Sequence, residues 1–549
     1  MFHFVVGTVP HAQRSPSLSA APYTRSVLEV AGEFEIHIMA HAQHAERMAA
    51  FAAEHGVKFI HIVLDRGEYV SQPMLTFTGH GALAEQHATV QRRQHELRTA
   101  GIYPCRSKIE AAPWCVGVPQ SDEQAESEPS GRYFEHHVKL LLTGAGVADL
   151  LALTDVVAPH GARLSRNARR TFGDGTQERF VTQRCHGVGL ASAKRQLDEL
   201  VETLRTAGHE PRTVEQEYVV FDSDLRHDRG WLDPPTSGTN DWALEREQGM
   251  RSAPGGSPHY PPTYQPLPAS LTVRQSAAFD PALKQYANAY RAGEPEFLVT
   301  ATGQRWSNAR RAAMKHLLSA IAATTWRQHL VLRGSVTMAT WVGAAAREPG
   351  DLDFVVTPHT ITSDSAEARA LLDDLKTATR TAPGAGLHPD LITESAIWTY
   401  ERADGRRLVI PFSAPEAPDG HVQLDVVFGE ELPLAPEALI LPEVDAPLLA
   451  APAELALAWK LLWLATDTYP QGKDLYDAVL LAEHTTVDRA LVRQLMRAEL
   501  GAEADTFTAE TVLSWQVDWT NFTDECPAIM GTAEQWIRRL ALALDGAWV

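Results

Sequence analysis

The segment 330–356 holds the residues whose types and spacing are best suited to chemistry. It reads LVLRGSVTMATWVGAAAREPGDLDFVV: an apolar strand ends at Gly334-Ser335, a helix follows, and the next strand opens with Asp351 and Asp353. Alternate side chains of a strand point to one face, so these two carboxylates lie on the same face of a sheet. Carboxylates placed in this way can hold Mg²⁺ ions that bridge the phosphates of a nucleotide.

Two further features extend this candidate site. Asp425 lies in a later apolar strand, VQLDVVFGE, and would supply a third carboxylate. The Gly334-Ser335 turn at a helix N-terminus offers backbone N–H groups and a hydroxyl to a phosphate. Each piece alone is common, but their ordered combination favours a metal-dependent nucleotidyl-transfer site with Asp351, Asp353 and Asp425 as catalytic metal ligands.

The helical pattern after Pro452 adds charged residues in apolar surroundings. Lys460 is the only cation in ELALAWKLLWLAT, so its ammonium either reaches the surface or faces an anion. The triphosphate expected nearby favours phosphate binding. Asp474 and Asp477 lie about one helical turn apart on one face. They either cap the helix and pair with Lys473, or they place Lys460 or the acceptor.

In these motifs, residues 300–490 resemble the AbiEii-type nucleotidyltransferase toxins of the polymerase-β-like superfamily. The family pattern has a glycine and a small or hydroxyl residue, an arginine before D-L-D-F, a strand Asp before F-G, a helix lysine, and a basic residue before D-x-x-D. In this chain the matching residues are Gly334-Ser335, Arg347, Asp351-Leu352-Asp353-Phe354, Asp425 with Phe428-Gly429, Lys460, Lys473-Asp474 and Asp477. Arg333 and Lys473 depart from the family, which often has glycine and usually arginine there.

The resemblance implies transfer of NMP from an NTP to an acceptor by in-line attack, with Mg²⁺ as cofactor. Asp425 then completes the metal site or acts as general base. The implied catalytic residues are Asp351, Asp353, Asp425, Lys460, Asp474 and Asp477, and the implied nucleotide contacts are Gly334, Ser335, Arg347 and Lys460. The implied acceptor is RNA, notably tRNA, in a toxin–antitoxin or phage-defence role with a cognate antitoxin as a further partner.

Two other functions remain open from the residues. One is a nucleotidyltransferase that modifies a small hydroxylated molecule such as an antibiotic. The other is a non-catalytic nucleotide- or RNA-binding regulatory protein that keeps the fold. The retention of three carboxylates and of Lys460 argues against the second, because an inactive site has no physical reason to keep these carboxylates together.

The elements that must position these residues predict an α+β fold. Residues 30–118 and 131–225 each read β-α-β-β-α-β, with ELRTAG and TLRTAG at equivalent points, which predicts two ferredoxin-like repeats. A Pro/Gly-rich linker is expected over 226–275. The nucleotidyltransferase domain, a polymerase-β-like mixed sheet, follows over 276–450, beginning with a predicted helix over 280–293. A helical C-terminal bundle is predicted over 451–549.

The charge distribution separates the two halves of the chain. The net charge is −20, which excludes a generic polyanion binder. Residues 1–230 carry 24 Lys/Arg and 28 Asp/Glu, a deficit of 4, which leaves a deficit of 16 for the remaining residues. The chain lacks a run of about 18 apolar residues and a signal-peptide core, so no membrane association and a cytoplasmic location are expected.

The front half has a basic segment and many histidines. The basic segment predicts either an RNA-tracking face or a solvated strand edge. Its arginines are Arg163, Arg166, Arg169, Arg170, Arg179 and Arg184. The strand histidines are His37, His61, His136, His137 and His186. Packing or solvent exposure is favoured for them over metal ligation, so no catalysis is assigned to residues 1–230.

Overall fold

The structure is a computed structural model that describes residues 29–171, 175–232, 264–267, 272–281, 290–397, 404–442, 444 and 446–549. Most of the predicted linker over 226–275 lies outside these residues. Among the described residues, no helix is both long enough and apolar enough to cross a membrane.

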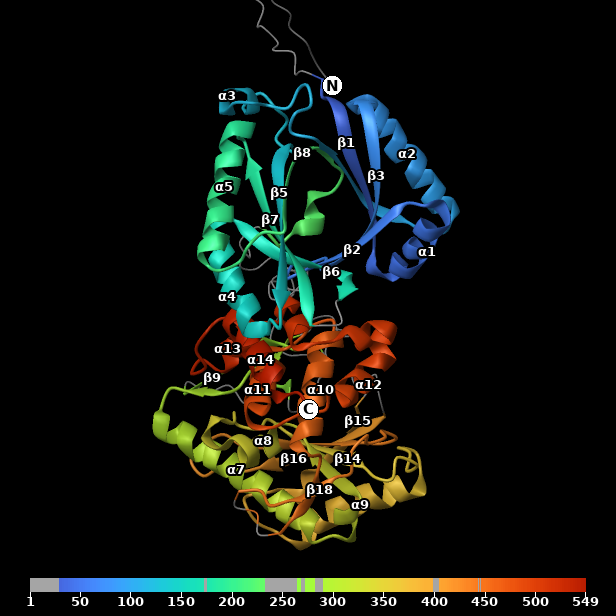
Figure 1. Cartoon of the computed structure of the whole chain (residues 1–549). Helices are drawn as coiled ribbons and strands as arrows, with labels where there is room; N and C mark the ends of the chain where they lie inside the picture. The colour runs from blue at the N-terminus through green and yellow to red at the C-terminus, as the bar shows by residue number, and fades with distance from the viewer. Residues whose placement is uncertain are drawn as a thin grey trace, which may run out of the picture.

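The front half forms a closed barrel of eight strands, drawn in blue to green in Figure 1. The strands are β1 (Ala31–Ala40), β2 (Lys58–Leu64), β3 (Ser71–Ala82), β4 (Pro104–Ala111), β5 (Tyr133–Thr143), β6 (Ala162–Thr171), β7 (Thr176–His186) and β8 (Thr213–Asp222). They follow the order β1-β3-β2-β6-β7-β5-β8-β4 around the barrel. The helices are α1 (Ala45–His55), α2 (Leu83–Thr99), the short α3 (Asp122–Ala125), α4 (Val147–Val157) and α5 (Leu190–Thr206).

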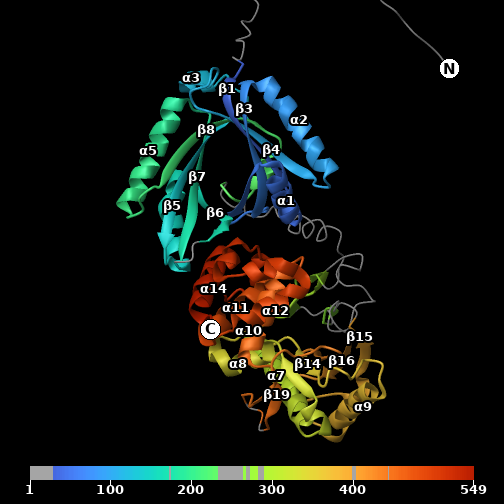
Figure 2. The same cartoon turned by 45° about the vertical axis from the view of Figure 1, so that its right-hand side comes forward.

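Strand alternation separates an apolar core, between the strands and the outer helices, from a charged barrel interior. On β1, Phe34, Ile36 and Ile38 are buried in a core shared with residues of α1 and α2. The intervening Glu35 and His37 line a cavity inside the barrel. The period of two therefore sends apolar side chains toward the helices and ionisable ones inward. Figure 2 shows the helices on the outside of the barrel strands.

The second half contains a seven-stranded mixed sheet of order β15-β16-β17-β14-β13-β19-β18. Its strands are β13 (Leu330–Arg333), β14 (Leu352–Val356), β15 (Thr393–Ala396), β16 (Gly405–Phe412), β17 (Gly420–Val427), β18 (Glu437–Leu439) and β19 (Leu448–Ala450). Helices α7 (Thr300–Ala322) and α9 (Ala366–Thr381) supply side chains to its apolar core. Helix α8 (Ser335–Val342) connects β13 to β14.

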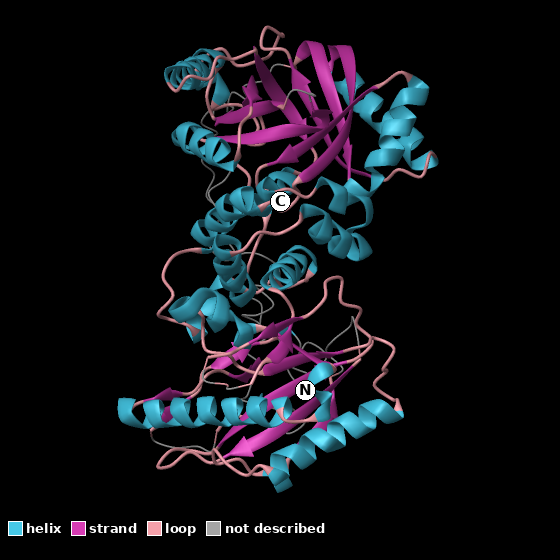
Figure 3. Ribbon diagram, turned by 60° about the horizontal axis from the view of Figure 1, so that its bottom comes forward, coloured by secondary structure: helices cyan, strands magenta, loops and turns pink. Residues whose placement is uncertain are grey.

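A helical layer lies between the barrel and the mixed sheet, as Figures 2 and 3 show. It comprises α10 (Ala453–Thr466), α11 (Gly472–His484), α12 (Arg489–Leu500), α13 (Trp519–Glu525) and α14 (Ala533–Ala547). Its core also includes Val147 and Leu151 of α4 and Met338 and Val342 of α8. The helices therefore pack against elements from both neighbouring parts of the chain.

The predicted helix over 280–293 is wrong for the part that the structure describes. Residues 282–289 lie outside the described residues, while Tyr290–Ala292 forms strand β11, paired with Ala277–Phe279 of strand β10. Phe279 packs edge-on against both Tyr290 and Tyr469. This aromatic packing and the strand pairing override the helical pattern at Tyr290–Ala292. Two further short strands, β9 (Val273–Arg274) and β12 (Glu296–Phe297), pair nearby.

The basic segment forms neither a free strand edge nor one continuous exposed face. β6 pairs with β7 on one side and with β2 on the other, so it is an internal strand of the barrel. Arg179 is 4% exposed and forms an ion pair with Glu510 of the helical layer. Arg184 lies inside the barrel, where it contacts Glu135 and Asp228. Closure of the barrel thus buries two of the six arginines and removes the predicted edge.

Candidate active site

Four charged residues form a row across adjacent strands of the mixed sheet. Backbone register pairs Arg333 of β13 with Asp353 of β14, Asp353 with Asp425 of β17, and Asp425 with Arg407 of β16. Directly paired residues project on the same face of a sheet. The two aspartates predicted from separate strands are therefore neighbours, and each has an arginine beside it on the outer strand.

Asp351 joins this row from the residue before β14. Asp351, Asp353 and Asp425 each offer a carboxylate oxygen, and these oxygens all lie within 4.8 Å of one another. Burial, followed by the charges of Asp351 and Asp425, raises the pKa of Asp353 to about 8. Burial also raises the pKa of Asp425, against the opposing effect of Arg407. The three carboxylates thus repel one another in the absence of a bound cation.

Gly334 makes room for this arrangement. Its φ of +81° lies in a region that side-chain-bearing residues rarely adopt. A Cβ at this position would lie 2.7 Å from Oδ2 of Asp353. Ser335 directly follows as the buried first residue of α8. The glycine predicted from the motif is therefore required both by the turn and by the close approach of the Asp353 carboxylate.

Arg407 is a site residue that the sequence interpretation missed. Its Nε and one terminal nitrogen donate to the two carboxylate oxygens of Asp425, each at 2.8 Å. Gln423 donates to the same carboxylate at 3.1 Å. Burial lowers the pKa of Arg407, but its bonds to Asp425 outweigh this effect and raise it. The only sequence signal was a basic pair, Arg406-Arg407, at the start of an apolar strand.

Lys460, Asp474, Asp477 and Arg347 form a second cluster beside the carboxylates. The Lys460 ammonium donates to Asp474 at 2.7 Å and lies 3.3 Å from Asp477. Arg347 donates to both oxygens of Asp477, at 3.1 and 3.0 Å. Lys460 therefore does not reach the surface; Asp474 and Asp477 place it, as one of the two sequence interpretations expects.

The charges of this second cluster stabilise one another. Burial alone would lower the pKa of Lys460, but Asp474 and Asp477 raise it. Burial would raise the pKa of Asp474, but Lys460 and Lys473 lower it. With Arg347 included, two cations face two buried carboxylates. The predicted contacts of Lys460 and Arg347 with a phosphate would have to be made in addition to these ion pairs.

Lys473 is an exposed lysine whose charge acts on one of the three carboxylates. It lowers the pKa of Asp353, although burial and the other aspartates dominate. It also lines a cavity of about 100 Å³ at the start of α11, together with Tyr469 and Phe522. Its neighbour Asp474 bonds to Lys460, so the alternative in which Asp474 merely caps the helix and pairs with Lys473 is not the arrangement found.

Arg333, one of the two departures from the family pattern, is buried away from solvent. It donates to the two carboxylate oxygens of Glu430 at 3.0 and 2.8 Å. Its guanidinium carbon lies 5.3 Å from the ring centroid of Trp459. The ion pair and the cation–π contact account for a large basic residue at a position where a glycine often stands.

The residues present fit a divalent cation. Asp351, Asp353 and Asp425 supply only oxygen donors, which Mg²⁺ prefers. Their mutual repulsion is the electrostatic condition that a bound cation relieves. Arg407 supplies one positive charge to the three carboxylates, so it does not balance them.

One comparison with known proteins, the family match, agrees with this reading of the second half. Residues 316–537 match the family model described as nucleotidyl transferase AbiEii toxin, Type IV TA system. No curated protein matches the chain. A crystal structure described as a chlorite dismutase aligns with 37% of this chain and all of its own, at 17% identity and a TM-score of 0.14, which is too low to define a fold.

The family match extends beyond the motif region to the beginning of α14, so it includes the row of aspartates and the Lys460 cluster. Residues 316–537 of this chain are therefore similar to the AbiEii nucleotidyl transferase toxin family, as the motifs of the second half predict.

Proposed function

We propose that the chain is a nucleotidyltransferase that transfers NMP from an NTP to an acceptor hydroxyl, in a toxin–antitoxin role. The observation that carries this proposal is the convergence of Asp351, Asp353 and Asp425 within 4.8 Å inside the family-matched segment. A balanced structural ion-pair network has no need for three neighbouring carboxylates.

In this proposal Asp351, Asp353 and Asp425 hold Mg²⁺. When bound, the cation would neutralise charge on the nucleotide phosphates and on the attacking oxygen. The N–H groups at the start of α8, with the Ser335 hydroxyl, bind a phosphate, and Gly334 leaves room for Asp353. Arg407 engages both oxygens of Asp425, which favours a charge-holding role for this carboxylate over that of a general base.

The second cluster acts mainly by positioning. Asp474 and Asp477 fix Lys460, and Asp477 fixes Arg347, whose backbone lies four residues before Asp351. This arrangement orients the loop that leads into the metal-binding carboxylates. Lys473 is exposed and lies close enough to lower the pKa of Asp353, so we assign to it the direct contact with the triphosphate.

The acceptor is proposed from the family rather than from the shape of the site. An RNA acceptor, tRNA in particular, and a cognate antitoxin follow from the toxin–antitoxin description of the family. A small hydroxylated acceptor stays as the second candidate, since the small cavity beside Lys473 suits a compact ligand as well as an RNA end.

We also infer that the barrel consists of two ferredoxin-like units, 30–118 and 131–225. The order is β1-α1-β2-β3-α2-β4 in the first and β5-α4-β6-β7-α5-β8, with a short helical turn after α4, in the second. Within each unit the first strand pairs with the third and fourth, and the second pairs with the third. Pairing between β2 and β6 and between β4 and β8 joins the units.

The test is a transfer assay with the full chain, each α-labelled NTP, Mg²⁺, and either total tRNA or a set of small hydroxylated molecules. We expect label on tRNA, with Asp353→Asn reducing the rate by about 10²–10³-fold. The matched control is Asp373→Asn, which changes an exposed aspartate of α9 in the same domain. Label only on small molecules would select the second candidate. Nucleotide binding without transfer to any acceptor would overturn both.

A further inference from the structure

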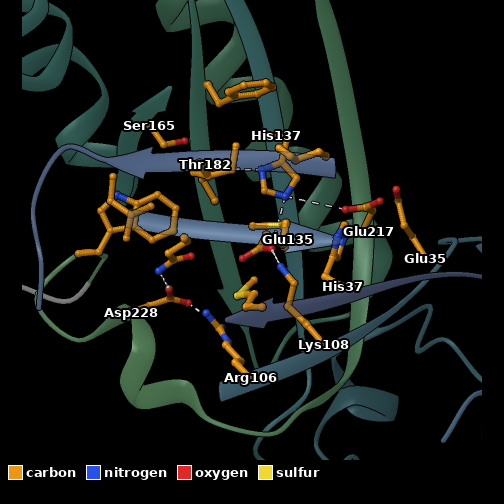
Figure 4. A pocket seen from close by; sticks show the side chains of 18 of the residues that line it. Glu35, His37, Arg106, Lys108, Glu135, His137, Ser165, Thr182, Glu217 and Asp228 are labelled. Atoms are coloured by element: carbon orange, nitrogen blue, oxygen red, sulfur yellow. Dashed lines mark hydrogen bonds and ion pairs between the residues drawn. The ribbon is translucent and has the colours of Figure 1, made fainter. Parts of the chain in front are cut away.

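The barrel interior holds a second group of carboxylates and histidines, separate from the proposed transfer site. Glu35 and His37 of β1 and Glu135 and His137 of β5 line one cavity. In Figure 4 the labelled His137 side chain points toward Glu135 and Glu217, and Lys108 points toward Glu135. Because side chains alternate along a strand, Glu35 and His37 face the cavity, while the intervening Ile36 packs in the apolar core.

The two halves of the barrel contribute matching histidines. Each lies in a Phe-Glu-x-His run, Phe34 to His37 on β1 and Phe134 to His137 on β5. His37 Nδ1 lies 3.0 Å from the Thr76 hydroxyl, and His137 Nδ1 lies 3.1 Å from the Thr182 hydroxyl. In both, a threonine on the adjacent strand holds one ring nitrogen and leaves Nε2 for a further partner, the arrangement typical of metal-binding histidines.

The Nε2 atom of each histidine faces carboxylates. His37 Nε2 lies 2.8 Å from Glu110. His137 Nε2 lies 3.4 Å from Glu135 and 3.8 Å from Glu217. Ligand atoms of Glu35, His37 and Glu110 lie within 4.8 Å of one another, and so do those of Glu110, Glu135 and His137. Glu110 belongs to both sets, so the two histidine sites meet at one carboxylate.

The ion pairs of this interior leave negative charge uncompensated. Its mostly buried carboxylates are Glu110, Glu135, Glu217, Asp222 and Asp228. The cations that contact them are Lys108, Arg106 and Arg184. At the rim Glu35 is balanced by Lys58. Burial and the nearby charge of Glu110 raise the pKa of Glu217 well above its ordinary value, so this carboxyl favours its neutral form. The other four carboxylates still exceed the three cations by one charge, which a bound cation would offset.

The cavity beside this cluster is large enough for a cation and its remaining ligands. Its volume is about 140 Å³, whereas one water occupies about 30 Å³ of liquid. Ile60, Ile62, Phe180 and Trp231 line it alongside the charged residues. A cation bound at the polar side would therefore face a partly apolar space that can admit waters or a small organic ligand.

We propose that the barrel binds one divalent first-row transition-metal cation, such as Zn²⁺ or Mn²⁺, through His37, His137 and the carboxylates around Glu110. Imidazole together with carboxylate donors suits these ions better than Mg²⁺ or Ca²⁺, which take oxygen ligands. Lys108, which contacts Glu110 and Glu135, remains as a counter-ion for the excess carboxylates. This proposal does not depend on nucleotidyl transfer.

The test uses the full chain carrying Asp351→Ala and Asp353→Ala, so that the other carboxylate site cannot contribute. This protein is incubated with Zn²⁺ or Co²⁺, desalted and assayed for metal by mass spectrometry, with Co²⁺ also followed by visible absorption. We expect about one cation per chain. Adding His37→Gln with His137→Gln should weaken the affinity by at least about 10–100-fold and remove the Co²⁺ absorption bands.

The matched control is His61→Gln, which changes a histidine whose neighbours Ile60 and Ile62, rather than His61 itself, line the cavity. It should retain the cation. Glu110→Gln, which keeps the side-chain shape, gives a second loss variant, and circular dichroism verifies the fold of each. Absence of bound metal in the parent protein would overturn the proposal, and so would affinity unchanged by both the histidine pair and Glu110→Gln.

Discussion

Two lysines in different parts of the molecule are buried between pairs of carboxylates, and their surroundings differ in charge balance. In the helical layer, Lys460 contacts Asp474 and Asp477, and Arg347 binds Asp477 as well. Two cations there face two carboxylates. The charges of the cluster balance and both carboxylates have a partner, which agrees with the proposed positioning of the helix and of the loop before Asp351.

In the barrel, Lys108 contacts Glu110 and Glu135 in the same manner, but Glu217, Asp222 and Asp228 add further carboxyl groups. The arginines nearby do not balance the total. The comparison teaches that a buried lysine between carboxylates is not by itself a functional signal. The net charge of the whole cluster separates a positioning network from one that has room for a cation.

The largest expected effect comes from removing each lysine. Lys460→Met leaves Asp474 without its ammonium partner and should reduce the free energy of unfolding by about 3–5 kcal/mol, with no recovery on adding Zn²⁺. Lys108→Met should cause a comparable loss without metal, and Zn²⁺ should restore most of it, since the cation takes over the counter-charge. Urea unfolding with and without Zn²⁺ measures both. An identical response of the two variants to Zn²⁺ would contradict the proposed difference in charge balance between the two clusters.

The repulsion among the three aspartates should make the free energy of unfolding depend on pH. The pKa of Asp353 is raised to about 8 in the folded protein, above its ordinary value. Between the two pKa values the folded state holds a proton that the unfolded state releases, so stability falls as pH rises through that window and levels off above about pH 8. The slope is about 1.4 kcal/mol per pH unit. Unfolding of metal-free protein at a series of pH values measures it.

Asp353→Asn is the matched comparison for that measurement, because the amide cannot ionise and its own contribution to the slope is absent. Saturating Mg²⁺ should also flatten the curve of the unmodified protein, since a bound cation favours the ionised carboxylate. Equal slopes for the metal-free unmodified and Asp353→Asn proteins would contradict the assigned repulsion.

The smallest effect is expected from the exposed arginines of the basic segment. Arg169 and Arg170 already contact Glu46 and Glu178. The double change to alanine should leave stability within about 0.5 kcal/mol and leave the salt dependence of tRNA binding unchanged. If the slope of log affinity against log salt concentration fell in magnitude by about 2, both side chains would instead contact phosphates. Filter binding at several salt concentrations decides between these outcomes.

The candidate transfer site was largely readable from the sequence because its parts are local. Gly334, Asp351 and Asp353 lie within one strand–helix–strand segment, and strand alternation fixes which face the aspartates share. Asp425 could be proposed as the third carboxylate, but its pairing with Asp353 depends on the parallel register of β14 and β17. Arg407 escaped notice because its partner lies across an antiparallel strand pair.

For the barrel, the sequence predicted the individual strands and helices but not their closure around one cavity. The eight strands of the barrel and its four longer helices were predictable from periodicity and glycine placement. The interpretation favoured packing or solvent exposure for His37 and His137, because isolated strand histidines more often pack or face solvent, and these two lie a hundred residues apart. Closure through β2–β6 and β4–β8 pairing brings their strands around one cavity.

The sequence by itself thus determined the secondary structure of most of the chain, the identity of the carboxylate motif and its family. Those features rest on interactions between residues close in the chain or on strand periodicity. The tertiary structure alone decided the partners of Arg407, Lys460 and Arg179 and the charged interior of the barrel. Contacts between distant segments depend on strand register and closure, and the net charge of a buried cluster can be counted only after those contacts are known.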